Sequence, residues 1–414
     1  MEILRSLNYP NFRLHTIGQS LSLLGTWMQR IAISWLVYNL TDSVFWLGFV
    51  SFISLLPSLV LSPFIGSYVD KHSKYKLVVT TQVLLFIQAG ALTLLVYFGW
   101  ETLTWLCVLG FIQGVINAYD VLSRQALLSS LVDNRRDLPN AIALNSSVFN
   151  AARMLGPAIG GVLLSGYGEF ACFLANFLSF VPVLYTLSKM RVNEKIILID
   201  QRETNWQGLV DGFHYLKRSP HIGSLIIIMT CSSLFVIPFT SLLPAVARDL
   251  FHGNETTFSW FESAAGFGAM IGAIRMASLK SGENLRYRVM FSALIMGGAL
   301  LFLAYAHYLL SALFFTMAVS FAMMMQNSSM NTYIQTHAMP TYKARIMSYY
   351  VMAFQGMFPI GALLTGAIAD AIGLQNTLYL MGTVGIFIAF TYYIYLRLHL
   401  NRKLFKFKYI KKQD

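Results

Sequence analysis

The chain has 414 residues, of which 56% are hydrophobic and only 12% are charged, and its mean hydropathy is +0.58. Such a composition offers too little polar surface for a water-soluble globule, so it indicates an integral membrane protein. The formal net charge of +12 does not indicate a nucleic-acid partner, because the bases are scattered between apolar segments and lipid headgroups are the expected counter-charge.

Twelve apolar segments follow one another along the chain. A helix needs roughly 20 apolar residues to cross a bilayer, and no open-edged backbone can face lipid, so each segment is predicted to be a transmembrane helix. The predicted spans cover residues 12–39, 45–68, 77–98, 104–122, 140–166, 170–188, 221–247, 257–278, 289–306, 309–330, 346–371 and 376–396. The predicted fold class is an all-α membrane protein with twelve transmembrane helices in two six-helix bundles.

One long polar interruption, residues 189–220, divides the chain near its middle. Trp206, Leu209, Phe213 and Leu216 recur in it at helical spacing, which predicts an amphipathic helix at the membrane interface. Such a helix suits a tether between the two halves, and a regulatory element is the alternative. The predicted domains are an N-terminal bundle at 1–188, a linker at 189–220, a C-terminal bundle at 221–397 and a basic tail at 398–414.

A short internal repeat supports this division. The run from Gly161 to Gly166 reads GVLLSG, and the run from Gly361 to Gly366 reads GALLTG. Because the two runs fall in matching helices of the two halves, they favour a duplication of one six-helix unit.

The distribution of bases predicts the orientation. Alternate loops, counted from the N-terminus, hold nearly all the bases, and the other set of loops holds only Arg248. By the positive-inside rule, both termini are expected to be cytoplasmic. The opposite loops carry the acids Asp42, Glu101, Glu169, Asp249 and Glu255.

The loop after the second span has a distinctive pattern of one acid among several bases. Its residues are Gly66, Asp70, Lys71, Lys74 and Lys76. This spacing resembles the loop 2-3 motif of the major facilitator superfamily, although any cytoplasmic loop of a membrane protein is basic. The resemblance implies a gating motif in which the loop joins an acid and a base of the fourth helix in a latch that holds the outward-open state.

Asp120 and Arg124 occupy the matching end of the fourth span. They lie one helical turn apart, so they are expected to pair with each other and to reach the Asp70 loop. The alternative is an ordinary interfacial ion pair worth about 0.5 kcal/mol.

The fifth span contains Gly156, Pro157, Gly160 and Gly161, a kinking proline beside a face of small residues. The run resembles the fifth-helix motif of drug and metabolite antiporters in the same superfamily, and a kinked packing helix without that role is the alternative. Longer stretches, at 131–146, 150–157, 331–336 and 345–348, are similar to the transmembrane secretion effector branch, which includes enterobactin exporters and macrolide efflux proteins. One departure is Gly110, where many relatives carry an arginine linked to proton transfer.

Two bases lie deep in the predicted spans. Arg30 is about nine residues from the outer end of its span, hence roughly 14 Å deep, and Arg153 is similarly central. A charge at that depth costs about 2.5 to 3.5 kcal/mol, so each is expected to face the bundle interior and to meet a partner or an anionic ligand. For Arg153, ties to backbone carbonyls beside Pro157 are an equal alternative.

Glu262 is the clearest acid within a span, and it is expected to lie shallower than the two bases. A carboxyl that alternates between an apolar and a basic environment is a workable proton switch, and a water-facing interfacial acid is the alternative. The remaining cavity candidates are polar residues of the central spans, namely Gln113, Asn117, Asn150, Asn331, Gln335 and Gln355.

These features predict a secondary transporter of the bacterial inner membrane, monomeric, with alternating access around a central cavity. The preferred function is proton-driven export of an amphipathic, anionic, siderophore-like small molecule. Uptake of a siderophore or metabolite, multidrug or macrolide efflux, and a sensor that does not transport are the alternatives. No enzyme activity, cofactor, metal site or nucleic-acid partner is expected, and the partners are the substrate, protons and membrane lipids.

Overall fold

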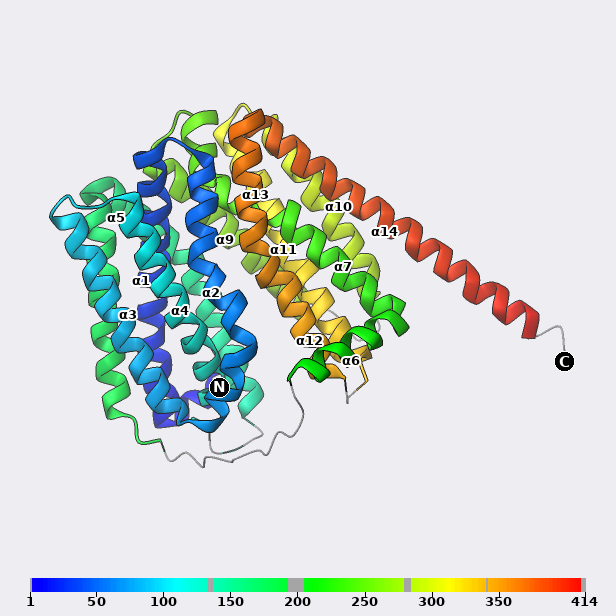
Figure 1. Cartoon of the computed structure of the whole chain (residues 1–414), viewed down its shortest axis with the longest axis horizontal. Coiled ribbons are helices and arrows are strands. Elements are labelled where there is room, and N and C mark those ends of the chain that lie inside the picture. Colours follow the sequence, from blue (N-terminus) through cyan, green and yellow to red (C-terminus); the bar gives the residue numbers. More distant parts are fainter. Residues whose placement is uncertain are drawn as a thin grey trace.

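A computed structural model describes residues 2–132, 134, 137–192, 205–278, 284–339 and 342–410. Within these ranges it leaves undescribed the side chains of 2–4, 62–64, 66, 67, 70, 139, 205–209, 211, 277, 344 and 399–410. The described chain contains helices and no strands (Figure 1).

The helices follow the predicted order. Their bounds are η1 Glu2–Asn8, α1 Pro10–Thr41, α2 Val44–Lys71, α3 Lys74–Tyr97, α4 Leu103–Leu128, α5 Leu138–Lys189, α6 Asn205–Arg218, α7 Pro220–Phe235, η2 Ile237–Leu242, α8 Leu243–Ala245, η3 Val246–Leu250, α9 Glu255–Ala277, α10 Leu285–Ala304, α11 Leu309–His337, α12 Lys343–Val351, η4 Met352–Gly356, α13 Met357–Ile372 and α14 Leu374–Ile410. Side-chain caps begin several of them: the Ser73 hydroxyl accepts from Lys76 N at 3.2 Å, and the Asn254 side chain accepts from Thr257 N at 3.3 Å.

Helix α5 is a hairpin rather than one rod. Gly168 breaks it with φ 74° and ψ −175°, a conformation that glycine adopts without a Cβ penalty. Cys172 Sγ lies 3.3 Å from Gly160 O, whereas twelve residues of straight helix would span roughly 18 Å. The two predicted spans at 140–166 and 170–188 are therefore the two arms of α5.

Nine helical segments of the described chain are apolar enough to cross a membrane, with α5 counted once. Dividing α5 at Gly168 and including α1 and α9 gives the twelve predicted passes. Helices α1 and α9 are less apolar because they carry Arg30 and Glu262, the charges discussed below. The predicted last span at 376–396 agrees with the apolar part of α14, Leu374–Leu398, while the helix itself continues to Ile410 because no Pro or Gly interrupts it after Gly385.

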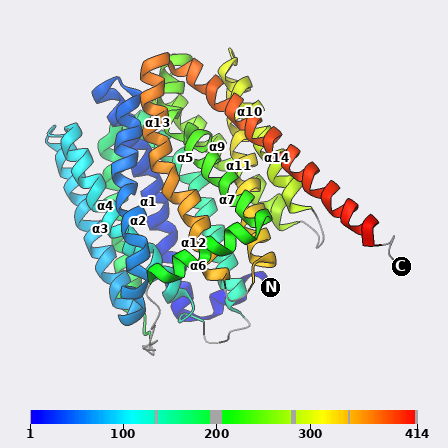
Figure 2. The ribbon, with the colours of Figure 1, turned by 45° about the vertical axis from the view of Figure 1, so that its right-hand side comes forward.

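The helices form two halves that pack along two interfaces. Helices α1–α5 make one half and α7–α14 the other, and they meet where α2 packs on α13 and α5 packs on α9. Figures 1 and 2 both show α13 beside α2. The two halves converge at one end of the bundle and spread apart toward the other end, which carries the N-terminus and α6 (Figure 1).

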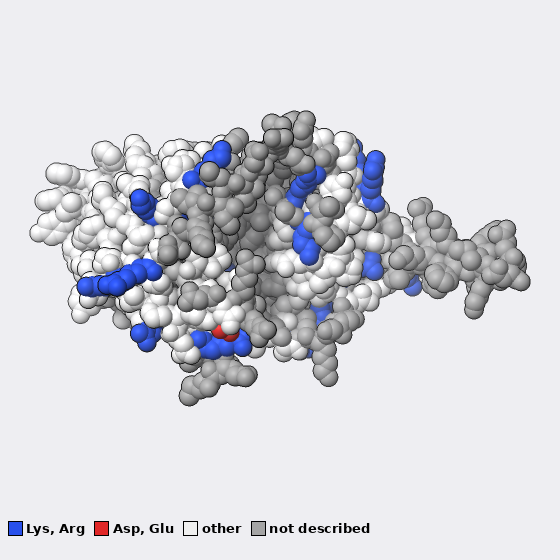
Figure 3. All heavy atoms as spheres, turned by 90° about the horizontal axis from the view of Figure 1, so that it is seen from below, with Lys and Arg blue, Asp and Glu red and all other residues white. Residues whose placement is uncertain are grey.

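We call the spread end the basic end, because it carries Arg5, Lys71 and Lys76, and we call the opposite end the far end. Figure 3 looks onto the basic end, where Lys and Arg side chains are spread over both sides of the molecule. Helix α6 docks on the second half at this end, with the Tyr215 ring stacked on Tyr342 at 4.9 Å. The amphipathic linker helix thus packs against α12 as well as lying at one end of the bundle.

Candidate functional site

The small residues of α5 let three helices meet at the centre of the molecule. A Cβ on Gly156 would lie 2.5 Å from Trp27 Cβ, and one on Gly160 would lie 3.1 Å from Met28 Cα, so these glycines admit α1. Gly161 points to another partner, because its Cβ would clash with the Ser259 side chain of α9. The predicted fifth-helix motif therefore packs α1 on one side and the opposite half on the other.

Two guanidinium groups share one indole ring beside this junction. Arg30 Cζ lies 5.0 Å and Arg153 Cζ lies 5.9 Å from the centroid of the Trp27 ring. Neither arginine forms an ion pair or a hydrogen bond with any residue that the structure describes. Arg30 is exposed although it lies in the middle of α1, and Arg153 is half-buried. The indole thus holds two charged groups that have no acid in contact.

Glu262 of α9 faces this pair from the other half. Its helix touches α1 through the stacked rings of Trp35 and Phe258, 5.9 Å apart, and a Cβ on Gly266 would lie 2.8 Å from Arg153 O. Glu262 lies one turn from each of these contacts, and its carboxyl is within electrostatic range of both Arg30 and Arg153. Three charges from three helices and both halves therefore meet at this site.

The other polar candidates contribute less to this cluster. Gln335 donates to Asn331 Oδ1 at 2.8 Å, and Asn150 donates to its own helix at Ser146 O, 2.9 Å away. Within the described chain Gln113, Asn117 and Gln355 make no hydrogen bond, and the first two are half-buried. Trp27 was not singled out from the sequence, since a tryptophan in an apolar span carries no signal of its own.

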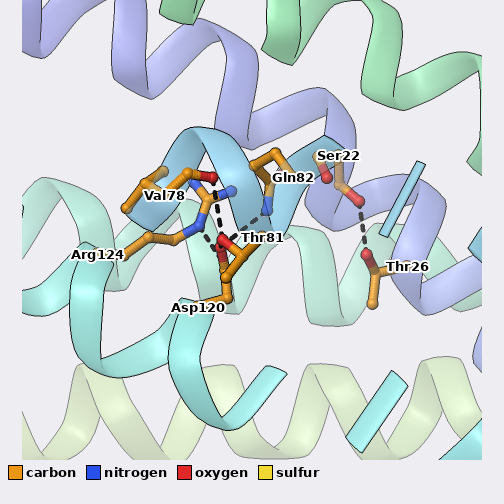
Figure 4. A network of polar contacts seen from close by, with 7 residues as sticks. All are labelled: Ser22, Thr26, Val78, Thr81, Gln82, Asp120 and Arg124. Carbon is orange, nitrogen blue, oxygen red and sulfur yellow. Dashed lines mark hydrogen bonds and ion pairs between the residues drawn. The ribbon is translucent and has the colours of Figure 1, made fainter. Parts of the chain in front are cut away.

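Asp120 and Arg124 form part of a buried network inside the first half (Figure 4). Arg124 Nε lies 2.6 Å from Asp120 Oδ2, and Oδ1 accepts from Thr81 at 2.6 Å and from Gln82 at 2.9 Å. Both charged side chains are nearly buried, at 12% and 10% exposure, and His15 is buried close to them. Sequence reasoning did not find the Thr81 and Gln82 partners, because they come from α3 and look like ordinary polar residues of a span.

The loop motif can be followed only in part. The side chains of Gly66 and Asp70 lie outside the described residues, whereas Lys71 and Lys76 are exposed and Lys74 is half-buried. Gly110 packs against α2, since a Cβ there would lie 2.5 Å from Ser54 Oγ, and the Ser54 hydroxyl would have to turn away to admit a larger side chain.

A set of polar contacts joins the two halves at the far end. Arg248 Nη2 lies 2.8 Å from Asp42 Oδ1, its guanidinium lies 5.3 Å from the Tyr38 ring, and the Tyr38 hydroxyl donates to Asp249. Asp370 of α13 caps α2 from outside, accepting from Ser43 Oγ at 2.6 Å and from Val44 N at 3.0 Å. We call these contacts the far-end latch, which is formed by Tyr38, Asp42, Ser43, Val44, Arg248, Asp249 and Asp370.

No group of His, Cys, Asp and Glu in the described ranges could hold a metal ion. The three cysteines, Cys107, Cys172 and Cys231, are free.

Comparison with known proteins agrees with this architecture. Residues 4–404 match the family model described as transmembrane secretion effector. The chain is 27% identical to the staphyloferrin A transporter of Staphylococcus aureus (strain NCTC 8325 / PS 47), over 92% of this chain and 94% of that protein. It is 24% identical to macrolide efflux protein A of Streptococcus pyogenes, over 92% and 96% of the two chains.

Two solved structures share the fold. A bacterial homologue of the human lysosomal transporter Spinster, inward-facing and unoccupied, superposes with a TM-score of 0.75 at 11% identity, over 94% of this chain and 97% of that one. A bacterial homologue of the iron transporter ferroportin, also inward-facing, gives 0.71 at 16% identity, over 93% and 97%. The relatives and fold neighbours are membrane transporters rather than enzymes. The chain is therefore a multi-pass membrane protein that belongs to the transmembrane secretion effector family of the major facilitator superfamily.

Proposed function

We propose that this transporter exports an amphipathic, anionic, siderophore-like small molecule across the bacterial inner membrane by alternating access, driven by proton entry. The anionic substrate is supported by the two guanidiniums on the Trp27 ring, Arg30 and Arg153, which lie deep along their helices and have no acid in contact among the described residues. Export is supported by the fifth-helix motif and by relatives named for efflux of macrolides and for transport of staphyloferrin A, a siderophore.

The orientation in this proposal comes from charge. The basic end faces the cytoplasm by the positive-inside rule, so both termini and α6 are cytoplasmic and the far-end latch is external. The molecule acts as a monomer whose halves rock about the α2–α13 and α5–α9 interfaces, with the far end closed in the conformation described here.

A direct test compares a strain lacking the gene with its complemented parent under iron limitation. Export predicts that the deletion strain retains siderophore inside the cell and secretes less, and that Arg30→Gln does not restore secretion at equal membrane abundance. Equal secretion with reduced uptake of added iron–siderophore complex would reverse the assigned direction.

Proton-coupled uptake is the second candidate, and the position of Glu262 favours it. An ionised Glu262 competes with an anionic substrate for Arg30 and Arg153, because both anions would pair with the same guanidiniums. Protonation of Glu262 would then favour binding of the anion, and a proton and a substrate that bind together are the mark of a symporter. Export by antiport requires the opposite linkage, so it places the coupling proton on another group.

The pH dependence of anion affinity separates export by antiport from uptake by symport. Anion affinity of the purified protein, measured from pH 5.5 to 8.5, should rise with pH for an antiporter and fall with pH for a symporter coupled at Glu262. Flux into proteoliposomes under inward and outward pH gradients then assigns the direction.

A further inference from the structure

The indole of Trp27 relates the two guanidiniums, which have no acid partner among the described residues. Each guanidinium carbon lies within 6 Å of the same ring centroid, so their separation is no larger than the sum of the two distances. Trp27 is itself held in place, because Gly156 of α5 packs directly on its Cβ. The packing of α1 on α5 therefore keeps the two charges on one ring and close to each other.

The charges at this site do not balance. Arg30 and Arg153 are within electrostatic range of each other and repel, and Glu262 supplies at most one negative charge to the two positive ones. Each guanidinium presents a planar fork of N–H donors that fits one carboxylate with two parallel hydrogen bonds. A ligand with one acid group can fill one fork and leaves the other guanidinium unpaired.

From this geometry we infer that the site is a two-point receptor for a ligand that carries two acid groups, with Arg30 and Arg153 each taking one and Trp27 keeping them close to each other. This inference rests on the proposed transport of an anion and adds the number of acid groups that the substrate must carry. Arg30, which is exposed, meets the ligand first, and Arg153, which is half-buried, binds the deeper group. The aromatic rings beside the pair, Trp27 and Phe149 at 6.1 Å, offer an apolar surface to the scaffold between the two acids.

Two rigid probes of equal apolar size test the inference without knowledge of the natural substrate. Naphthalene-2,6-dicarboxylate and naphthalene-2-carboxylate differ only in the second acid group, and calorimetric titration of the purified full chain in detergent gives both affinities. The dicarboxylate should bind at least about tenfold more tightly, since it adds a second charge-assisted pair of hydrogen bonds.

Variants assign this preference to the two arginines. Arg30→Gln and Arg153→Gln should each bring the ratio of the two affinities close to one, whereas Arg13→Gln, an exposed base of the same helix, should leave it unchanged. Trp27→Phe should keep most of the preference and Trp27→Leu should lose it, because only an aromatic ring can hold both guanidiniums. If a Gln variant does not fold, the Lys variant at that position keeps the charge but not the planar fork, and a reduced ratio is again expected.

Several outcomes would overturn the inference. Equal affinity of the wild-type protein for the two probes, failure of the dicarboxylate to bind, or a preference that survives in both Gln variants would each reject two-point binding. This test is separate from the test of the proposed function. If anion binding depends on Arg30 but shows no preference for two acid groups, the proposed anion transport stands and only the two-point receptor is rejected.

Discussion

At the scale of single residues, one acid, Glu262, lies near two bases, Arg30 and Arg153, so removing it should raise the affinity of the site for an anion. Glu262→Gln leaves a neutral amide at every pH, so it no longer competes with a bound anion. Anion affinity in the variant should therefore be high and independent of pH. Flux driven by a pH gradient should fall strongly under the uptake candidate, which places the coupling proton on Glu262, and should persist under antiport coupled at another group.

Glu255→Gln is the matched control, because Glu255 lies in the first turn of the same helix, two turns away. Calorimetry at several pH values and flux in proteoliposomes measure the two effects. Flux that remains coupled to the gradient in the Glu262 variant would remove this residue as the coupling site.

The Asp120 network predicts stability rather than substrate binding. Asp120→Leu leaves Arg124 buried without its acid, which should cost about 3 kcal/mol, and it also removes the acceptor of Thr81 and Gln82. The double variant Asp120→Leu with Arg124→Leu removes both charges, so it should recover most of that loss.

The measurement is the unfolding midpoint of each purified variant in the same detergent. A double variant that is no more stable than the single one would show that the hydrogen bonds to α3, and not the buried charge, account for the effect. Asp120→Asn separates the loss of the charge from the loss of the hydrogen bonds, because its amide oxygen still accepts from Thr81 and Gln82.

At the scale of helices, the glycine motif of α5 divides into contacts within one half and a contact between halves. Gly161→Leu should block transport, since its side chain would enter the space of Ser259 on the opposite half, whereas Gly160→Leu strikes Met28 within the same half and should lower stability as well. Gly166→Leu is the control, because nothing lies within 4 Å of its Cβ position.

Flux per inserted molecule and the unfolding midpoint are compared across the three variants. A Gly161→Leu protein with normal flux would mean that the α5–α9 contact is not needed for the transport cycle. Equal losses in the Gly166 control would point instead to a general effect of leucine in this helix.

The helices were predictable from the sequence because their signal is local. The length of each apolar segment, and the Pro, Gly and polar residues between segments, are enough to place twelve spans. The two arms of the α5 hairpin were also predicted, as two spans that flank Gly168. The helix α14 extends beyond the predicted span to Ile410, since loss of hydropathy marks the end of a membrane span but not the end of a helix.

The arrangement of the site was less predictable, because it depends on contacts between distant segments. Arg30 and Arg153 were found as charges in apolar spans, but nothing in the sequence joins them to Trp27 or brings Glu262 within range of both. Arg248 was the exception in the sequence, because it is the one base in the loops that otherwise carry acids. In the structure it pairs with Asp42 and lies over the Tyr38 ring, so it joins the two halves.

At the scale of the whole molecule, the halves are joined at the far end and spread at the basic end (Figures 1 and 3). The ion pair of the far-end latch is exposed, with Asp42 at 72% and Arg248 at 39% exposure, so it contributes little by itself. Alternating access needs such contacts, because a latch worth many kcal/mol would trap one state.

The latch can therefore be weakened in steps. Asp370→Ala removes the external cap of α2, worth about 1 kcal/mol, and Arg248→Ala removes the ion pair with Asp42 and the contact with Tyr38. The double variant should shift the population toward the state that is open at the far end by roughly tenfold, since 1.4 kcal/mol corresponds to a factor of ten.

Accessibility of one introduced thiol measures this shift. Ser34→Cys lies on the same face of α1 as Arg30 and Tyr38, one turn from each, so it should be reached from the far side only when the latch opens. In a background that lacks the three native cysteines, a membrane-impermeant maleimide added outside intact cells should label it faster in the latch variants. Glu169→Ala, which removes an acid from the turn of the α5 hairpin, is the control and should not change the rate. Unchanged labelling in the double variant would show that the helix packing of α2 on α13 and of α5 on α9 closes the far end without the latch.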